Sequence, residues 1–466
     1  MIRKMLIDGQ LVDGALTLDV VNPATGEIAE TCARADSDQL DAAVAAAKRA
    51  FPAWSGLPDD ERRGKLLALA DAIDARSGEF ARLLTLEQGK PLAQAEFEAG
   101  AAAAAFRTFA DFKLETITRV DEAHQRIIEH RTPLGVVATI TPWNFPLLLL
   151  AGKVAPALMA GNTVVSKPAP TTPLTSLLFG EVAQPILPPG VLNIVVDQND
   201  LGSRLTSHPD VAKVSFTGST ATGKRVMESV SSSLKRLTLE LGGNDAAIVL
   251  DDVDVKEVAP RIFDAAMLNA GQVCLAAKRV YVPTSLYDAM CEELARLADA
   301  AIVDEGLRQG TQIGPVQNRQ QFEKLKTYLD DARENGTVIA GGDPLDRPGY
   351  FIAPTIVRDI PDSARLVREE QFGPILPVLS YEDLDEVVAR ANDSEFGLGG
   401  TIWTANPERG LELAMKIDSG VVWVNKHLDL PFDMPFRGAK QSGLGVENGQ
   451  EGFHEFTQAK IINMAL

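Results

Sequence analysis

Residues 135–146 read Gly-Val-Val-Ala-Thr-Ile-Thr-Pro-Trp-Asn-Phe-Pro. The apolar run at 136–141 has no polar alternation, which is typical of a strand buried on both faces of a parallel sheet. Helix-like stretches separate it from further short runs rich in Val and Ile, at 163–166, 192–196, 212–216 and 246–250. This alternation predicts βαβ units, and therefore an α/β fold in which helices cover a parallel sheet.

The flanking segments complete this outline. Helical patterns precede the series at 37–49, 59–77, 79–88 and 92–112. Residues 117–131 place isolated apolar residues among charges, as in an exposed two-stranded arm. A second strand-and-helix series begins after Asn269. Two α/β domains with an arm agree with the prior of about 150 residues per domain for a chain of 466 residues.

The composition excludes several classes of protein. Apolar residues make up 45% of the chain and charged residues 23%, so it is neither disordered nor fibrous. The net charge of −19 opposes binding to nucleic acid or to an anionic membrane. The most apolar run, 145–152, is far shorter than the roughly 20 residues that span a bilayer, and residues 1–14 lack the apolar stretch of a secretory signal. We expect a cytoplasmic protein.

The three cysteines are Cys32, Cys274 and Cys291, and no C-x-x-C spacing occurs, so neither a disulfide framework nor a cysteine-based metal site is predicted. A lone cysteine is usually a small buried apolar residue. Cys274, however, follows a glycine-containing turn at the expected junction of the two domains, where clefts form. A basic neighbour or aimed dipoles would be needed to make it a nucleophile.

Two further polar residues are candidates for chemistry. Glu240 is flanked by leucines, and burial would raise its pKa toward the range of a general base, although a solvated strand end is the more common alternative. Asn144 carries an amide N–H₂ group that can stabilise an oxyanion, or can simply bond its own backbone.

Residues 218–224 read Gly-Ser-Thr-Ala-Thr-Gly-Lys, close to the P-loop pattern G-x-x-x-x-G-K. Arg225 stands where such a loop needs a Ser or Thr for Mg²⁺, so an NTPase is only a minor alternative. The strict dinucleotide pattern G-x-G-x-x-G is also absent. The segment keeps small residues at a helix N-terminus, where free backbone N–H groups suit a phosphate or pyrophosphate, and an ordinary strand-to-helix turn is the other interpretation.

Taken together, these stretches resemble the aldehyde dehydrogenase superfamily, and the resemblance covers nearly the whole chain in order. It also includes Glu-Gln-Gly-Lys-Pro at 87–91, Pro-Gly-Val-Leu-Asn at 189–193, Glu-Gln-Phe-Gly-Pro at 370–374, Trp-Val-Asn at 423–425 and Pro-Phe-Arg-Gly-Ala-Lys-Gln-Ser-Gly at 435–443.

The resemblance implies a division of the chain into three parts. A Rossmann-like NAD(P)-binding domain would comprise 1–116 and 134–240, and an α/β catalytic domain 241–443. A small β oligomerisation arm at 117–133 and a tail at 444–466 would build a homodimer or homotetramer.

The same resemblance implies hydrolytic oxidation of an aldehyde with NAD or NADP and without a metal. Cys274 would attack the aldehyde carbonyl, while Asn144 and the Cys274 backbone N–H hold the oxyanion. Glu240 would activate the water that hydrolyses the resulting thioester, and Lys153 would assist proton handling. The implied cofactor contacts are Ile140, Thr141, Pro142, Trp143, Lys167, Gly218, Ser219, Leu241, Glu370 and Phe372. The implied substrate-pocket residues are Leu149, Gly152, Val273, Leu275, Leu430 and Phe436.

Four positions depart from the family pattern. Pro170 stands where many relatives have a Glu that binds the adenosine ribose, so the choice between NAD and NADP stays open. Gln458 replaces a C-terminal Glu that some relatives use in proton relay. Arg437 stands at a usual Gly, and Gly152 at a frequent bulky aromatic.

These residues bear on the substrate. The apolar pocket positions, together with the space at Gly152, favour a medium or large apolar or aromatic aldehyde. The alternative is a semialdehyde, whose carboxylate Arg437, Lys426 or His427 would bind.

Two other functions stay open. A CoA-acylating semialdehyde dehydrogenase would share the fold but usually lacks the water-activating Glu, so Glu240 argues against it. A non-catalytic structural or binding protein on the same fold is disfavoured because Cys274, Glu240 and Asn144 occur together.

Overall fold

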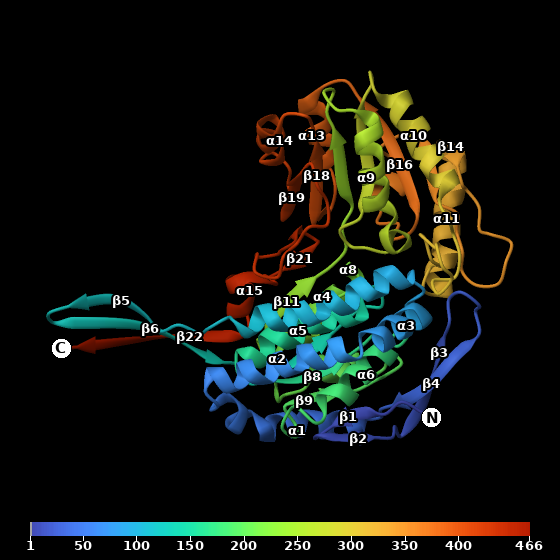
Figure 1. Ribbon diagram of the computed structural model, residues 1–466. Coiled ribbons are helices and arrows are strands. Elements are labelled where there is room, and N and C mark those ends of the chain that lie inside the picture. The colour runs from blue at the N-terminus through green and yellow to red at the C-terminus, as the bar shows by residue number, and fades with distance from the viewer. Residues whose placement is uncertain (1) are drawn as a thin grey trace.

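The computed structural model describes residues 2–466, and it consists of two sheet-and-helix lobes and a projecting arm (Figure 1). The first lobe is built on an eight-stranded sheet with the order β2-β1-β9-β8-β7-β10-β11-β21. Its central strands are parallel, as predicted: β7 (Val136–Ile140), β8 (Thr163–Lys167), β9 (Leu192–Ile194), β10 (Val211–Thr217) and β11 (Arg236–Glu240). The antiparallel edges are β1 (Met5–Ile7), β2 (Gln10–Val12) and β21 (Gly443–Leu444).

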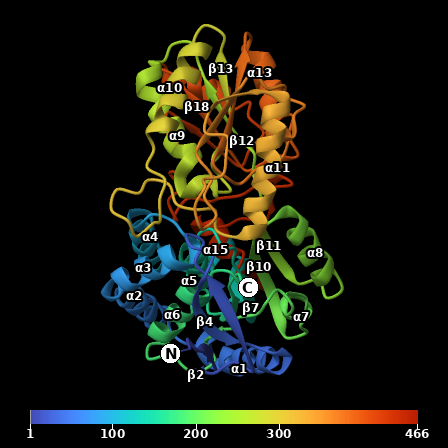
Figure 2. The same ribbon diagram turned by 90° about the vertical axis from the view of Figure 1, so that its right-hand side faces the viewer.

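Helices cover both faces of this sheet (Figures 1 and 2). They are α1 (Ser37–Ser55), α2 (Asp59–Ala75), α3 (Ser77–Gln88), α4 (Leu92–Ala110), α5 (Pro146–Met159), α6 (Leu174–Ala183), α7 (Gly202–Ser207) and α8 (Thr220–Ser231). The alanine-rich α4 packs closely on α2 and α5, and one apolar core joins these helices to the sheet. The helices predicted before residue 113 are confirmed.

The second lobe contains a seven-stranded sheet with the order β14-β15-β16-β13-β12-β18-β19. Its strands are β12 (Asp245–Val249), β13 (Ala277–Pro283), β14 (Thr337–Ala340), β15 (Thr355–Arg358), β16 (Ile375–Tyr381), β18 (Gly399–Trp403) and β19 (Val421–Val424), all parallel except β14. Its helices are α9 (Val255–Met267), α10 (Tyr287–Ala300), α11 (Arg319–Asn335), α12 (Arg365–Arg368), α13 (Leu384–Asn392) and α14 (Pro407–Ala414). The run 246–250, grouped by sequence with the first series, lies in this second sheet.

The predicted arm is also present. Strands β5 (Ile117–Glu122), β6 (Gln125–Pro133) and β22 (Thr457–Ala465) form a three-stranded sheet that projects from the body and carries the C-terminus (Figure 1). The remaining elements are the hairpin of β3 (Leu16–Val21) and β4 (Ile28–Arg34), the short pair β17 (Phe396–Gly397) and β20 (Ala439–Lys440), and helix α15 (Gly449–His454).

The topology brings the candidate residues together between the two sheets. Strands β7, β8, β10 and β11 end at the same edge of the first sheet, and the chain passes from Glu240 on β11 directly to β12. Cys274 precedes β13, and Glu370 precedes β16, at the amino edge of the second sheet. Ligand sites in open α/β sheets lie at the carboxyl ends of the strands, which here are those of the first sheet. Among residues 2–466, no helix combines the length and apolarity needed to cross a membrane.

Candidate active site

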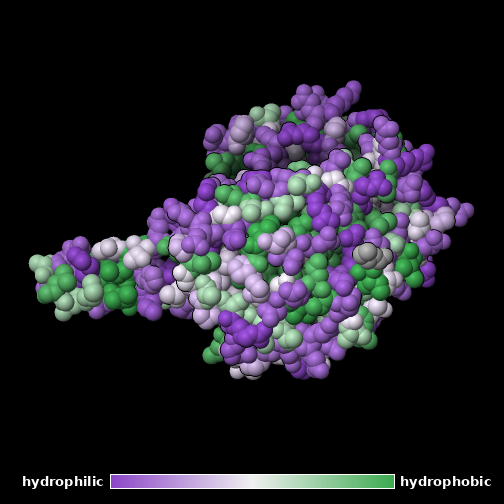
Figure 3. All heavy atoms as spheres, turned by 60° about the horizontal axis from the view of Figure 1, so that its bottom comes forward, coloured by the Kyte–Doolittle hydropathy of each residue, from purple (hydrophilic) through white to green (hydrophobic). Residues whose placement is uncertain are grey.

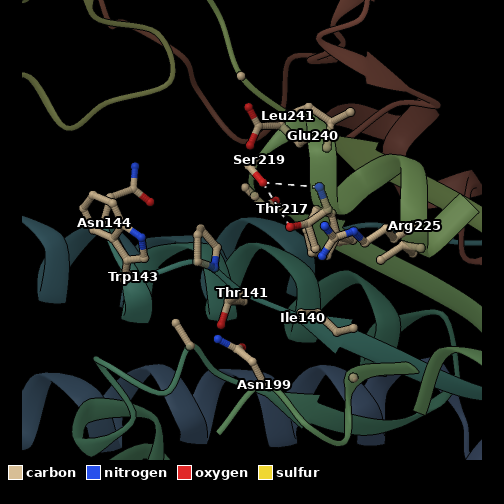
Figure 4. Close-up of a pocket in the computed structure, with 18 of the residues that line it drawn as sticks. Ile140, Thr141, Trp143, Asn144, Asn199, Thr217, Ser219, Arg225, Glu240 and Leu241 are labelled. Atoms are coloured by element: carbon tan, nitrogen blue, oxygen red, sulfur yellow. Dashed lines mark hydrogen bonds between the residues drawn. The ribbon is translucent and has the colours of Figure 1, made fainter. Parts of the chain in front are cut away.

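A cavity of about 1320 Å³ opens between the two sheet edges (Figure 4). Asn144 and Trp143 project from one side of it, and Glu240, Leu241 and Ser219 from another (Figure 4). Its lining includes every residue named above as a cofactor contact, together with Asn144, Glu240, Cys274 and Pro170. The sequence had therefore grouped residues from six separate stretches that the fold does bring to one place.

One end of the cavity presents groups that suit a phosphorylated nucleotide. Ser219 is the N-cap of α8 and accepts a hydrogen bond from the Thr222 N–H at 3.3 Å. The first turn of α8 faces the cavity, and N–H groups there attract anions. Lys167, at the end of β8, is buried and paired with Asp197 at 2.7 Å.

The other end holds Glu370 and Phe372. The Glu370 carboxylate accepts a hydrogen bond from the Gly243 N–H at 3.0 Å. A Cβ atom at Gly242 would lie 2.4 Å from the same carboxylate, which explains the paired glycines as a close backbone approach. The Phe372 ring meets Trp143 edge to face, with 5.3 Å between centroids.

Glu240 has an environment suited to a general base. Both of its carboxylate oxygens are buried without a hydrogen-bond partner, and the residue is 4% exposed. Burial, followed by the charge of Glu447, raises the pKa of Glu240 to about 8, against the opposing charge of Lys153. Glu240 thus takes up and releases a proton near neutral pH.

Cys274 differs from the other two cysteines in its accessibility. Cys32 and Cys291 are fully buried in the two cores, and burial raises the pKa of their thiols to about 12 and about 11. Cys274 is half-buried and lines the cavity. Burial, followed by the charge of Glu240, raises the pKa of Cys274 well above its usual value, whereas Lys278 lowers it.

Asn144 is held by its backbone, which leaves its side chain aimed at the cavity. Its carbonyl oxygen accepts hydrogen bonds from Lys90 Nζ at 2.8 Å and from Asn269 Nδ2 at 3.0 Å. Lys90 is in turn paired with the buried Glu98 at 2.5 Å. The Asn144 amide donates one hydrogen bond to the Gln272 carbonyl at 3.0 Å, and its second N–H is available to a ligand.

Lys153 lies behind the cavity and not on its wall. Its Nζ contacts Ser215 Oγ at 3.2 Å and forms an ion pair with Glu447. Gln458, by contrast, is exposed on the arm strand β22 and accepts a hydrogen bond from Arg236 at 2.6 Å. The interpretation of Gln458 as a lost relay position is therefore wrong, because the carboxylate near Lys153 and Glu240 comes from Glu447.

The predicted substrate-pocket residues fall into two groups beside the main cavity. Val273, Leu275 and Phe436 share a buried apolar cluster, and Cys274 and Leu430 pack against it. Leu149 and Gly152 lie half-buried on α5. The Phe432 ring borders the expected space at Gly152, and a Cβ atom there would lie 3.6 Å from the ring, an ordinary van der Waals distance.

The three candidates for binding a substrate carboxylate have partners within the chain. Arg437 is exposed and paired with Glu451, and Lys426 is exposed and paired with Asp429 at 2.6 Å. The His427 ring nitrogen Nε2 contacts the Leu275 carbonyl at 2.6 Å. Burial lowers the pKa of His427 to about 4, so it is neutral near pH 7.

Sequence reasoning missed Glu447, Lys278, Lys90 and Phe432. Glu447 and Phe432 are ordinary residue types outside a diagnostic spacing, and only the fold brings them to the site. Lys278 follows Cys274 by four residues, but its type alone does not predict its contacts. Lys90 lies in the quoted motif 87–91, so the sequence did carry a signal for that residue.

A model of the aldehyde dehydrogenase family matches residues 12–462. Phenylacetaldehyde dehydrogenase of Pseudomonas fluorescens is 40% identical, over 99% of this chain and 96% of its own length. The succinate-semialdehyde dehydrogenase [NADP(+)] GabD of Escherichia coli is 37% identical, over 100% of this chain and 98% of its own. The NAD+ complex of an aldehyde dehydrogenase from Bacillus cereus superposes with a TM-score of 0.98 at 35% identity, covering 100% of this chain and 97% of that one.

The fold and the cavity are those of a nucleotide-dependent oxidoreductase. The chain belongs to the aldehyde dehydrogenase family. Its class of reaction is the oxidation of an aldehyde with NAD or NADP.

Proposed function

We propose that the chain oxidises an aldehyde to the carboxylic acid through a thioester on Cys274 that water hydrolyses. The observation that carries this proposal is the buried Glu240 carboxylate, which has no partner of its own and lies in the same cavity as Cys274. A group of this kind can bind a water molecule and remove its proton. An enzyme that passed its acyl group to CoA would have no need of it.

The residues that line the cavity fit NAD or NADP. The N-terminus of α8 can hold a pyrophosphate, Lys167 and Glu370 supply a cation and a carboxylate for ribose groups, and Phe372 packs beside a flat ring. When bound, the nicotinamide ring accepts the hydride that the aldehyde carbon loses.

The protein groups then have separate tasks. The Cys274 thiolate bonds to the aldehyde carbon, while the Asn144 amide and the Cys274 N–H stabilise the resulting oxyanion. After the hydride has left, the carbon is held as a thioester. Glu240 removes a proton from water, the hydroxide adds to the thioester, and the carboxylic acid leaves as the Cys274 sulfur is released. The ion pair of Lys153 and Glu447 is close enough for both charges to affect the pKa of Glu240, and we propose it as the group that receives that proton.

We propose an apolar, medium or large aldehyde as the substrate. The apolar cluster beside Cys274 supports this choice, as do the internal partners of Arg437 and Lys426. We expect kcat/KM for phenylacetaldehyde to exceed that for succinic semialdehyde by about tenfold or more, since an unpaired carboxylate in an apolar pocket costs more than 1.4 kcal/mol. Steady-state kinetics with both aldehydes checks this. Arg437→Ala is the matched control, and a selective loss of semialdehyde activity in that variant would overturn the choice.

We propose that the adenosine end accepts NADP as well as NAD, because Pro170 on the cavity wall has no carboxylate to repel a 2′-phosphate. Pro170→Glu is expected to raise KM for NADP by about tenfold or more and to leave KM for NAD unchanged or lower. Cofactor titrations at a saturating aldehyde concentration measure both constants. Pro170→Gln, which adds a longer side chain without charge, should keep the original ratio of KM for NADP to KM for NAD. If KM for NADP rose equally in both variants, the shape of the side chain and not its charge would be the cause.

We further propose that the arm joins copies of this chain into a homodimer or homotetramer. We propose the domain division implied by the resemblance with one change: β21 and the segment with Phe453 pack on the first lobe, and only β22 belongs to the arm. The arm carries exposed apolar residues, including Ile461 and Leu466, and apolar patches are visible along it (Figure 3). Exposed apolar surface on a projecting segment favours burial against a partner. Strand β22 is also an edge strand, with unpaired backbone groups on one side.

A further inference from the structure

A buried lysine contacts the loop of residues 269–274, which we call the nucleophile loop. Lys278 lies on β13 and is 1% exposed. Its Nζ donates hydrogen bonds to the carbonyl oxygens of Val273 at 2.8 Å and Cys274 at 2.6 Å. The same ammonium group lies 3.9 Å from the Glu370 carboxylate. One cation therefore joins the backbone of the proposed nucleophile to a second carboxylate of the cavity lining.

The loop that Lys278 holds is conformationally strained. Asn269, Ala270 and Gly271 have φ values of 52°, 54° and 70°, so three consecutive residues are left-handed and only the last is a glycine. Gly271 also packs so closely that a Cβ atom would lie 2.3 Å from the Gly373 carbonyl oxygen. Such a backbone persists only where its surroundings fix it.

Several contacts fix the two ends of this loop. The first end is held by the Asn269 side chain, which donates to the Asn144 carbonyl at 3.0 Å. The side chain of Gln272 accepts a hydrogen bond from the Gln317 N–H at 2.8 Å. The Lys278 ammonium holds the second end, at the residue that bears the thiol and at the residue before it.

The charges around the thiol give Lys278 a second effect. Glu240 and Glu370 both raise the pKa of Cys274, and Lys278 opposes them. Asp245, on the adjacent strand β12, is also close enough for Lys278 to lower its pKa, which burial raises to about 7. His427 is kept neutral by burial, so it adds no positive charge near pH 7. Lys278 thus opposes a set of carboxyl groups that disfavour a thiolate.

We propose that Lys278 is a positioning residue for the nucleophile: it fixes the backbone of Cys274 and supplies the positive charge that favours the thiolate over the thiol. This inference rests on the proposed function, because it assumes that Cys274 is the nucleophile. Lys278 contacts the Cys274 carbonyl, but no proposed catalytic step uses Lys278 directly.

The test is the pH dependence of Cys274 alkylation by iodoacetamide, an uncharged probe, without aldehyde or cofactor. Lys278→Met is expected to move the pH midpoint of the alkylation rate upward by about one unit or more. At a pH below the midpoint, alkylation should then be about tenfold slower than in the original protein. Lys278→Arg keeps the charge and should restore a midpoint near that of the original protein. The rate in Cys274→Ala gives the background from other groups.

Lys213→Met is the matched control. Lys213 is another fully buried lysine, on β10, and its Nζ contacts Thr238 Oγ1 at 2.5 Å and not the nucleophile loop. Its removal is expected to lower stability without moving the alkylation midpoint. A shift as large as that in Lys278→Met would mean that any buried lysine has this effect, and it would overturn the proposal.

Removal of Lys278 alone leaves Glu370 without its cation, and this variant can fail to fold. If Lys278→Met does not fold, the double variant Lys278→Met/Glu370→Gln is compared with the single variant Glu370→Gln. The double variant should have the higher pH midpoint of Cys274 alkylation. Equal midpoints in the folded variants would overturn the proposal. Because the alkylation needs no turnover, this result is separate from the proposed function, which fails only if Cys274→Ala still oxidises aldehyde.

Discussion

Cys274→Ala is expected to reduce aldehyde oxidation by at least about 10⁴-fold, because no covalent intermediate can form without the thiol. The half-buried Cys274 is the cysteine on the cavity wall, whereas Cys32 and Cys291 are enclosed in the two cores. Reduced cofactor is measured by its absorbance under saturating substrate. Because Cys274 is a small part of the cavity lining, the variant should still bind the oxidised cofactor, which quenching of Trp143 fluorescence can measure.

Cys291→Ala provides the matched control. Cys291 packs in the core of the second lobe, so its truncation should lower stability slightly and leave kcat unchanged. If Cys274→Ala retained more than about one hundredth of the original kcat, nucleophilic catalysis by this residue would be excluded.

Glu240→Gln is expected to lower the steady-state rate by about 10²- to 10⁴-fold, the range for removal of a general base. The first turnover should be affected less, since Glu240 is proposed to act after the thioester has formed. Rapid mixing would then show a burst of about one reduced cofactor per subunit, followed by a slow phase. If Glu240→Gln lowered the burst rate and the steady-state rate to the same extent, Glu240 would not act only after the thioester has formed.

The pH dependence gives a second measurement of Glu240. A base acts when it is deprotonated, and burial raises the pKa of Glu240 to about 8. The steady-state rate should therefore rise with pH through about 8, and Glu240→Gln should lose this limb. Glu87→Gln is the matched control: burial also raises the pKa of Glu87, to about 7, but that residue bonds to the start of α6 and does not line the cavity.

Local sequence was sufficient for most of the architecture. Short runs rich in Val and Ile, such as Val136–Ile140, are typical of strands buried on both faces, and periodic apolar patterns such as Tyr287–Ala300 predict amphipathic helices. Strand β11, Arg-Leu-Thr-Leu-Glu, was expected only as the strand end considered for Glu240, because it lies outside the uninterrupted apolar runs. The residue pattern grouped 246–250 with the first series, because a change of sheet leaves no mark in a strand's own sequence. Only the division implied by the resemblance separated this run from the first series.

The candidate site divides in the same way. Cys274, Glu240 and Asn144 stand in motifs specific enough to be recognised, and the structure brings all three to one cavity. Only the fold brings Glu447 to Lys153, because the two residues are far apart in sequence. Lys278 follows Cys274 by four residues, but its residue type alone does not predict the two backbone hydrogen bonds that it donates. The neighbour of Gly152 could not be predicted either, since the ring that borders its space comes from Phe432.

The pairing of the C-terminal segment has a consequence for how the protein is made. Strand β21 completes the edge of the first sheet beside β11, and β22 pairs with β6 along nine residue positions. During synthesis, one edge of β11 in the first lobe and one edge of β6 in the arm therefore stay unpaired until the last part of the chain leaves the ribosome. Because unpaired strand edges are aggregation-prone, a chain stopped short of β21 would expose two such edges at once.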